Sequence, residues 1–253
     1  MALLSEVVQI EKRLYSYWDE PLLEASNPVS LTLESWGVSN RDYTIGLISK
    51  PEVRIFLQKH FPLLHSYFDS FKIYCMRADI ARFVHLYLHG GFYADTHVEI
   101  RGSLNTLEVD DAVGQLNKKA TALVVGDPPP RPTLFGLFYA AKGSELLLKT
   151  LGVIQLRCQE LVEHGPTKAG QYATLMHLAT GNGLFDFVNM SAAIASEDPS
   201  DPHTVGEYYR YIPRWGHNSS VFQFYENRRI FAGDWIRGAG KHWYVLANEV
   251  DLL

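Results

Sequence analysis

Cysteines and long apolar runs are both scarce in this chain of 253 residues. The two cysteines, Cys75 and Cys158, have no metal-binding or redox spacing, which excludes a cysteine-ligated zinc motif and a disulfide-rich scaffold. Both lie in segments with helical periodicity, so we expect buried free thiols of a reducing compartment, with a disulfide between them as the alternative. No stretch approaches the roughly 20 apolar residues that a membrane span needs, so we expect no transmembrane segment.

The chain also lacks blocks of like charge, and its beginning predicts no leader sequence. The formal net charge is −5, and no block of like charge exceeds a few residues. This argues against nucleic acid as a partner, because its phosphates demand clustered Lys and Arg. The amino-terminal segment MALLSEVVQIEKRLYSYW has neither a basic start nor a long apolar run, unlike a signal peptide. We therefore expect a soluble, cytoplasmic protein.

Segments whose apolar residues follow the two-residue period of a strand alternate along the chain with segments that follow the period of a helix. Strand-like segments cover residues 14–18, 43–48, 121–125 and 134–141, and short aromatic-rich strands follow residue 186. Helical segments cover residues 28–36, 52–67 with a break near Pro62, 76–89, 144–164 and 171–180. Strands that alternate with helices indicate a mainly parallel sheet, and no repeat or low-complexity linker divides the chain. We predict a single α/β domain over residues 1–253.

The most informative stretch is residues 76–100, MRADIARFVHLYLHGGFYADTHVEI. Its apolar residues recur at intervals of three and four, as in an amphipathic helix: Met76, Ile80, Phe83, Val84 and Tyr87. Asp79 and Arg82 lie off this stripe, three residues apart, so they are neighbours on one face. Gly90 is placed to end the helix in a left-handed conformation.

A glycine turn and a short strand lead from this helix to a charged turn. Gly91 permits a sharp turn into the apolar residues 92–94, which predict a buried strand. Asp95 then falls at the carboxyl end of the strand, where open α/β sheets bind ligands. The alternation at 98–101 predicts a second short strand after the turn, which ends in His97. The carboxylates, the guanidinium and the imidazole of this stretch would thus lie close together. This arrangement is suited to binding a sugar that is attached to a metal-bound diphosphate.

These residues carry a family resemblance. The run Asp79-x-x-Arg82, then Gly90-Gly91-x-Tyr93-x-Asp95-x-His97, closely resembles the DXD region of glycosyltransferases with a sugar-binding DXD motif. That group includes the yeast-type initiating mannosyltransferases and the catalytic domains of clostridial glucosylating toxins. Weaker similarities lie at Tyr17-Trp18, at Ser35-Trp36 with Asn40-Arg41-Asp42-Tyr43, and at His164-Gly165-Pro166. The resemblance implies a GT-A type, Rossmann-like nucleotide-binding fold. Golgi members of the resembling family usually carry a membrane anchor, so with no transmembrane segment expected, the resemblance implies a bacterial, viral or delivered-effector form.

One position departs from the family pattern. The second aspartate of the motif is His97 here, which gives D-x-H. Imidazole can coordinate a divalent cation, but the lost negative charge weakens the binding of Mg²⁺ relative to Mn²⁺, which accepts nitrogen more readily. We therefore expect a divalent cation, Mn²⁺ favoured over Mg²⁺, with a decayed site that holds no metal as the alternative. His85 and His89 fall near the helix end, where we expect surface positions or partners of the helix dipole.

The resemblance also implies a role for each matching residue. Asp95 would contact the ribose, a sugar hydroxyl and the metal, and His97 would coordinate the metal. Asp79 and Arg82 would hydrogen-bond sugar hydroxyls. Arg82 could also stabilise the negative charge that develops on the diphosphate as the sugar–oxygen bond breaks. Asp95 and Arg82 are thus the catalytic candidates. The competing interpretation of Asp79 and Arg82 is a solvated ion pair on the helix surface.

Further contacts are expected outside this stretch. Trp18 could stack on the nucleotide base, with Tyr17 as the nearby alternative, while the competing interpretation of Trp18 is a core position. Metal sites in this fold often recruit another ligand from near the carboxyl terminus. Residues 238–243, GAGKHW, offer His242 as that metal ligand, with His217 as the runner-up.

Together, the residues and the resemblance predict a metal-dependent glycosyltransferase. The donor would be a nucleoside-diphosphate sugar, with UDP-hexose favoured and GDP-mannose second, and the family resemblance implies retention of the anomeric configuration. The acceptor would be a glycan, a lipid-linked saccharide or a protein hydroxyl. Two alternatives stay open: a non-catalytic sugar-nucleotide-binding protein with a degenerate metal site, and a metal-dependent phosphoesterase that uses Asp95 with histidines.

Overall fold

A central sheet of six strands organises the computed structural model, which describes residues 11–19, 28–106, 122–126, 134–164, 209–213 and 221–224. The strands are β1 (Arg13–Ser16), β2 (Thr44–Leu47), β3 (Gly91–Ala94), β4 (Val98–Ile100), β5 (Ala122–Gly126), β6 (Leu134–Ala140), β7 (Tyr209–Pro213) and β8 (Phe222–Phe224). The large sheet has the order β2-β1-β3-β6-β5-β7, and β4 and β8 form a second, two-stranded sheet.

The large sheet is mainly parallel. β1 pairs in parallel with β2 and β3, and β5 pairs in parallel with β7. β6 is antiparallel to both of its neighbours, β3 and β5. Five strands therefore run in one direction and only β6 runs against them within this sheet. This arrangement confirms the predicted fold class, an α/β fold with a mainly parallel sheet flanked by helices.

The helices match the predicted segments closely. They are α1 (Pro28–Ser39), α2 (Lys50–His60), α3 (Pro62–Phe68), α4 (Tyr74–His89) and α6 (Glu145–His164), with a short 3₁₀ helix η1 (Leu104–Thr106). The predicted break between α2 and α3 is confirmed, because Pro62 begins α3. The predicted helix at 171–180 lies outside the described residues.

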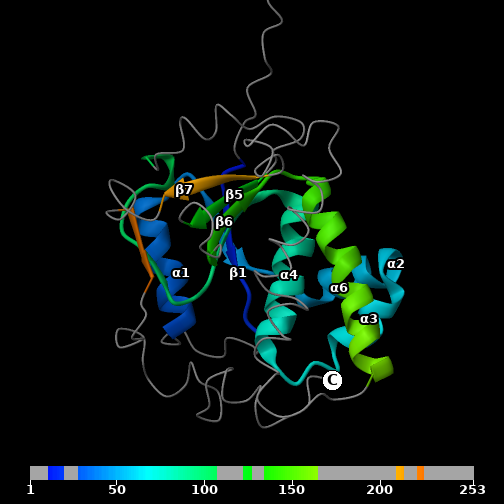
Figure 1. The fold of residues 1–253 in the computed structure, drawn as a ribbon. Coiled ribbons are helices and arrows are strands. Elements are labelled where there is room, and N and C mark those ends of the chain that lie inside the picture. Colours follow the sequence, from blue (N-terminus) through cyan, green and yellow to red (C-terminus); the bar gives the residue numbers. More distant parts are fainter. Residues whose placement is uncertain are drawn as a thin grey trace, which may run out of the picture.

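Alternate strand residues face two separate layers of helices. Tyr93 of β3 and Phe138 of β6 belong to one core cluster, with residues of α2, α3, α4 and α6. Their neighbours Phe92 and Tyr139 belong to the other cluster, which includes Trp36 of α1. The alternation follows from the two-residue period of a strand. Figure 1 shows the result, with α1 on one side of the strands and α4 and α6 on the other.

Two glycines join α4 to β3 at a point where no side chain fits. Gly90 has φ 69° and ψ −179°, so its positive φ confirms the predicted turn, whereas its extended ψ differs from the left-handed helical conformation that was expected. Gly91 has φ 104°, and a Cβ there would lie 2.8 Å from the backbone oxygen of Arg13. The missing side chain therefore lets β3 approach β1 closely.

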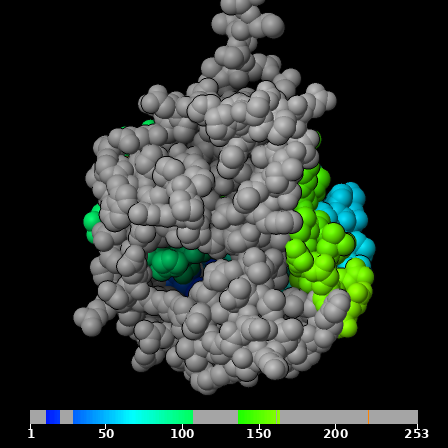
Figure 2. All heavy atoms as spheres, viewed as in Figure 1, coloured from blue at the N-terminus to red at the C-terminus, as the bar shows by residue number. Residues whose placement is uncertain are grey.

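Helices form part of the outer surface. Figure 2 shows α6 exposed beside the cyan atoms of the α2–α3 region. Among the described helices, none has the length and apolar character that crossing a bilayer requires. Cys75 in α4 and Cys158 in α6 are free thiols, as predicted, but only Cys158 is fully buried, and Cys75 is partly buried. Burial raises the pKa of Cys158 to about 12.

Candidate active site

The carboxyl ends of neighbouring parallel strands meet at one edge of the sheet. β1 lies beside β3 in parallel register, with Tyr15 opposite Tyr93. Residues 17–19 follow β1, and residues 95–97 follow β3 at the same edge. Open α/β sheets bind ligands at such an edge. The fold thus brings together the segments that were predicted separately to bind the nucleotide base and the metal.

Asp95 is fixed by its neighbours while its carboxylate stays accessible. The hydroxyl of Tyr93 donates a hydrogen bond to Asp95 Oδ1 at 2.7 Å, and Arg82 Nη1 lies 3.9 Å from the same oxygen. The backbone N–H of Asp95 donates to the carbonyl of Gly136 on β6 at 2.8 Å. The Asp95 side chain remains 28% exposed. A carboxylate that is held in place and open to solvent suits ligand binding.

His97 lies across the turn from Asp95. Its Nδ1 is 3.9 Å from Asp95 Oδ2, and its side chain is 41% exposed. The turn is closed by a hydrogen bond of 2.9 Å from the backbone N–H of Val98 to the carbonyl of Asp95. Two ligand atoms that are each about 2 Å from one ion lie at most about 4 Å apart. The imidazole and the carboxylate are therefore close enough to share a divalent cation.

Asp79 and Arg82 form a buried ion pair behind this turn. Arg82 Nη2 contacts Asp79 Oδ1, and the two side chains are 7% and 8% exposed. The guanidinium carbon of Arg82 also lies 4.8 Å from the centre of the Tyr93 ring. The interpretation of these residues as a solvated surface pair is therefore wrong. A sugar hydroxyl that reached them would meet a charged pair that is shielded from water.

A second charged network lies at the same edge, and sequence reasoning missed it. Asp19, which follows β1, accepts a hydrogen bond from Lys50 Nζ at 2.9 Å and forms an ion pair with Arg77. Burial alone would raise the pKa of Asp19, but hydrogen bonds from Tyr17 and Lys50 and the charge of Arg77 lower it below its usual range. The available signal was a charged residue within two positions of the end of each of two predicted strands, Asp19 after 14–18 and Lys50 after 43–48.

The two aromatic residues of the first segment differ in exposure. Tyr17 is 6% exposed and donates a hydrogen bond to Asp19 at 2.7 Å. Burial raises the pKa of Tyr17 strongly, so its hydroxyl stays protonated. Trp18 is only partly buried. The position of Trp18 therefore leaves part of its ring available to a ligand, whereas the Tyr17 ring is enclosed.

The early motif that resembles the family, which contains Trp36 and Asn40, binds the segment that follows the D-x-H turn. The indole N–H of Trp36 donates to the carbonyl of Val98 at 3.0 Å, one residue beyond His97. The side-chain oxygen of Asn40 accepts the backbone N–H of Leu104 at 2.7 Å. Both residues lie on or directly after α1, so these bonds fasten the segment that follows D-x-H to that helix.

Part of the predicted site cannot be described. His242, the predicted third metal ligand, and its alternative His217 lie outside the described residues. His164 is the last residue of α6, while the glycine and proline that follow it also lie outside. The described part of the site therefore consists of the edge formed by β1, β3 and the start of α4.

Comparison with known proteins agrees with this geometry. Residues 26–114 match the family model "Glycosyltransferase sugar-binding region containing DXD motif", a range that includes Asp79, Arg82, Asp95 and His97. No curated protein matches the sequence. The fold is similar to that of the PaToxG glycosyltransferase, with a TM-score of 0.52 and 15% identity over 78% of this chain and 73% of that one.

A more distant likeness is to a glycosyltransferase involved in the glycosylation of the major capsid of PBCV-1. It has a TM-score of 0.32 and 9% identity over 79% of this chain and 80% of that one, too low to carry an argument. The family match and the fold shared with PaToxG confirm the predicted resemblance. Residues 26–114 are thus similar to the sugar-binding region of glycosyltransferases with a DXD motif, and the fold is similar to that of one such enzyme.

Proposed function

We propose that this protein is a metal-dependent glycosyltransferase that moves a hexose from a nucleoside-diphosphate sugar to an acceptor hydroxyl. UDP-hexose is the favoured donor and GDP-mannose the second choice. The observation that carries the proposal is the position of Asp95 and His97 at the ligand-binding edge of the sheet, with the buried pair of Asp79 and Arg82 behind them. We further propose that residues 1–253 act as one domain.

The proposed metal site consists of Asp95 and His97, with His242 as the candidate third ligand. Glycosyltransferases with a DXD motif generally use a divalent cation, and the 3.9 Å between the Asp95 and His97 ligand atoms is compatible with one ion. When bound, the cation would stabilise the charge of the leaving diphosphate as a Lewis acid. Because one ligand is a nitrogen, we propose a preference for Mn²⁺ over Mg²⁺.

The donor sugar would lie between Asp95 and the Asp79–Arg82 pair. Carboxylate oxygens of Asp79 and Asp95 can accept hydrogen bonds from sugar hydroxyls, and the guanidinium of Arg82 can donate to them. Arg82 would also stabilise negative charge that develops on the sugar–phosphate oxygen. The partly exposed ring of Trp18 is the proposed platform for the nucleotide base.

The proposed reaction retains the anomeric configuration, as the family resemblance implies. The bond between the anomeric carbon and the diphosphate oxygen breaks, and its electron pair stays on the diphosphate. The acceptor oxygen bonds to the same face of that carbon and gives its proton to the departing phosphate. The acceptor would be a glycan, a lipid-linked saccharide or a protein hydroxyl.

A panel of donor-hydrolysis assays tests this function. The donors are UDP-glucose, UDP-galactose, UDP-N-acetylglucosamine and GDP-mannose, each with Mn²⁺, Mg²⁺ or chelator. We expect release of one nucleotide only in the presence of metal. Donor binding without metal dependence or turnover would contradict the proposed enzyme and favour a non-catalytic sugar-nucleotide-binding protein. Hydrolysis of simple phosphate esters, with no preference for sugar nucleotides, would instead favour a phosphoesterase.

The variant Asp95→Ala should abolish turnover while the protein stays folded. The matched control is Glu145→Ala, which removes a carboxylate whose side chain is 78% exposed on α6. Near-normal turnover by the Asp95 variant would refute the assignment of the site even if the activity itself were confirmed.

A further inference from the structure

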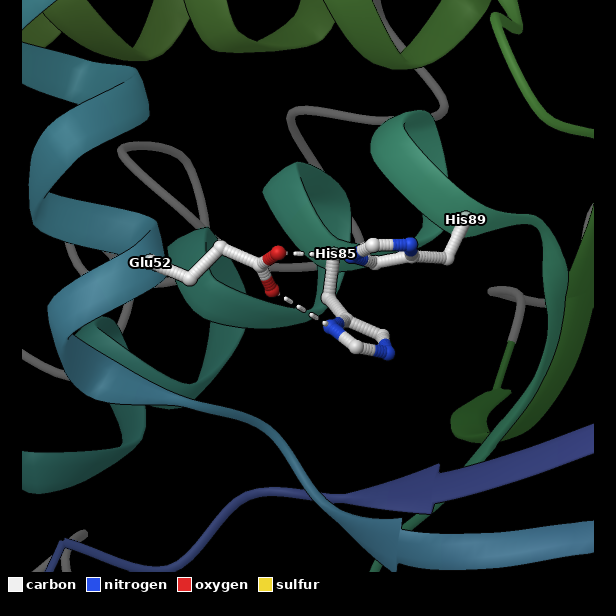
Figure 3. A group of neighbouring side chains, drawn as sticks. All are labelled: Glu52, His85 and His89. Carbon is white, nitrogen blue, oxygen red and sulfur yellow. Dashed lines mark hydrogen bonds and ion pairs between the residues drawn. The ribbon is translucent and has the colours of Figure 1, made fainter.

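A second group of potential metal ligands lies away from the D-x-H turn. Glu52 comes from α2, while His85 and His89 lie one turn apart on α4, and Figure 3 shows the three side chains converging. Their ligand atoms all lie within 4.8 Å of one another. His89 Nε2 is 2.8 Å from Glu52 Oε1, and His85 Nδ1 is 3.5 Å from Glu52 Oε2.

The burial of His85 is the unexpected feature of this cluster. His85 is 5% exposed, so the sequence-based expectation of a surface position is wrong. Among the described residues, neither ring nitrogen of His85 has a hydrogen-bond partner. Its Nδ1 points to the Glu52 carboxylate, but 3.5 Å is long for a hydrogen bond. Buried polar atoms are nearly always satisfied, so this nitrogen requires an explanation.

We propose that Glu52, His85 and His89 bind a first-row transition-metal ion, with Zn²⁺ as the best fit. In a tetrahedral zinc site the ligand atoms lie about 3.3 Å apart, and the two distances to Glu52 bracket that value. Two imidazole nitrogens with one carboxylate oxygen are a donor set that suits zinc. The ion would occupy the space between the Glu52 carboxylate and His85 Nδ1.

Solvent could supply a fourth ligand to an ion in this cluster. The side chains of Glu52 and His89 are 37% and 30% exposed, so solvent reaches the cluster from their side. On the other side the ring of Tyr15 packs edge-on against His85, with the ring centres 4.1 Å apart.

This site differs from the proposed donor site in place and in chemistry. From Arg82 to His89 the helix rises about 10 Å, because each residue adds about 1.5 Å. His85 and His89 lie toward the end of α4, while Asp79 and Arg82 lie earlier on the same helix. A metal ion here would cross-link α4 to α2. It would thereby fix the helix that carries the buried pair of the donor site.

Metal titration of the full chain tests the proposal. The protein is stripped with chelator and titrated with Co²⁺, whose visible absorption reports a tetrahedral nitrogen-containing site, and then with Zn²⁺. The Asp95→Ala background removes the carboxylate of the donor site. We expect one equivalent of Co²⁺ to bind, Zn²⁺ to displace it, and free Zn²⁺ at about a hundred times its Kd to raise Tm by about 5 °C or more.

Variants then identify the ligands. His89→Ala and Glu52→Gln change partly exposed side chains, so they should fold, and both should lose the Co²⁺ absorption and the Zn²⁺-dependent shift in Tm. His60→Ala removes an exposed histidine of α2 and should keep both signals. Absence of the two signals in the parent protein, or their persistence in His89→Ala, would overturn the proposal. Neither readout depends on catalysis, so the result is independent of the proposed transferase activity.

Discussion

The hydroxyl of Tyr93 donates a hydrogen bond of 2.7 Å to the carboxylate of Asp95, two residues further along the chain. Tyr93 is 1% exposed, and the carbon at the centre of the Arg82 guanidinium lies 4.8 Å from its ring centre. The tyrosine thus contacts the buried pair of Arg82 and Asp79 on one side and the accessible Asp95 on the other. It positions both halves of the proposed donor site without itself being exposed to a ligand.

Removing this hydroxyl should weaken metal binding. In Tyr93→Phe the ring still packs, but Asp95 loses the donor that orients its carboxylate. Partners that orient metal ligands typically contribute about 10- to 100-fold to metal affinity or activity. We expect a loss of that size in the apparent Mn²⁺ affinity, measured as the Mn²⁺ dependence of donor hydrolysis. The control Tyr67→Phe removes the hydroxyl of a different tyrosine, which lies on α3. An unchanged Mn²⁺ dependence in Tyr93→Phe would remove the proposed positioning role.

Removing one member of the buried pair of Asp79 and Arg82 should destabilise the protein more than removing both. Arg82→Met or Asp79→Leu alone leaves a buried charge without its partner, which costs about 3–5 kcal/mol. The double variant removes both charges and should regain most of that free energy of unfolding, yet remain inactive. Urea unfolding measures stability, and donor hydrolysis measures activity.

A matched pair on the surface supplies the control for that cycle. Arg157 and Glu160 have the same three-residue spacing, but their side chains are 42% and 54% exposed. Arg157→Met should therefore change the free energy of unfolding by no more than about 1 kcal/mol. Equal costs for Arg82→Met and Arg157→Met would show that burial of the Asp79–Arg82 pair has no energetic consequence.

The glycine beside β1 should tolerate no side chain. Gly91→Ala would place a Cβ 2.8 Å from both the Cβ and the backbone oxygen of Arg13, at a φ of 104°. Gly143 also has a positive φ, 76°, but a Cβ there meets nothing within 4 Å. Gly143→Ala therefore isolates the conformational cost, about 1–2 kcal/mol. Gly91→Ala should cost about 1–3 kcal/mol more through the clash, measured by urea unfolding. Equal losses would mean that β3 shifts freely.

Local sequence patterns predicted the helices, the strands and the central motif, because these features depend on the spacing of residues that are close in the sequence. The three-residue spacing made Asp79 and Arg82 neighbours, and the strand of residues 92–94 placed Asp95 at a carboxyl end. Burial of the pair could not be predicted in this way. It depends on Tyr93 and on the packing of α4 against the sheet, which are set by contacts between distant segments.

The residues that the sequence failed to reveal depend on the order of the strands. Asp19 and Lys50 each follow a strand, but their ion pair exists because β1 and β2 are neighbours in the sheet. Likewise, Glu52 meets His85 and His89 only because α2 packs beside α4. A single sequence indicates where strands end and which face of a helix is apolar. Predicting these clusters also requires knowing which strands and helices are neighbours in the fold.

The Asp19 network predicts a dependence of stability on pH. The pKa of Asp19 in the folded protein lies below its usual value, because its hydrogen bonds and the charge of Arg77 outweigh burial. Its stabilising contribution is therefore complete above the unfolded pKa of about 3.9 and is lost as the pH falls through the folded pKa. Asp19→Asn should cost about 1–2 kcal/mol at pH 7 and progressively less below about pH 4.

Urea unfolding of the wild type and of Asp19→Asn across this pH range measures the difference directly. The exposed control Glu145→Gln should shift the free energy of unfolding by less than about 0.5 kcal/mol at pH 7. A difference between wild type and Asp19→Asn that stayed constant down to pH 2 would show that ionisation of Asp19 does not stabilise the fold.

Replacing the histidine of the D-x-H turn should change the metal that the site prefers. His97→Asp restores the second carboxylate of the family pattern and replaces nitrogen with the oxygen that Mg²⁺ favours. The 3.9 Å between His97 Nδ1 and Asp95 Oδ2 makes this position the one at which a new carboxylate could share an ion with Asp95. We expect the ratio of donor hydrolysis with Mg²⁺ to that with Mn²⁺ to rise about tenfold, the change that about 1.4 kcal/mol of differential affinity produces. His65→Asp adds the same charge on α3 and should leave the ratio unchanged. If the two variants behave alike, His97 is not a metal ligand, and Asp95 must hold the cation with residues outside this turn.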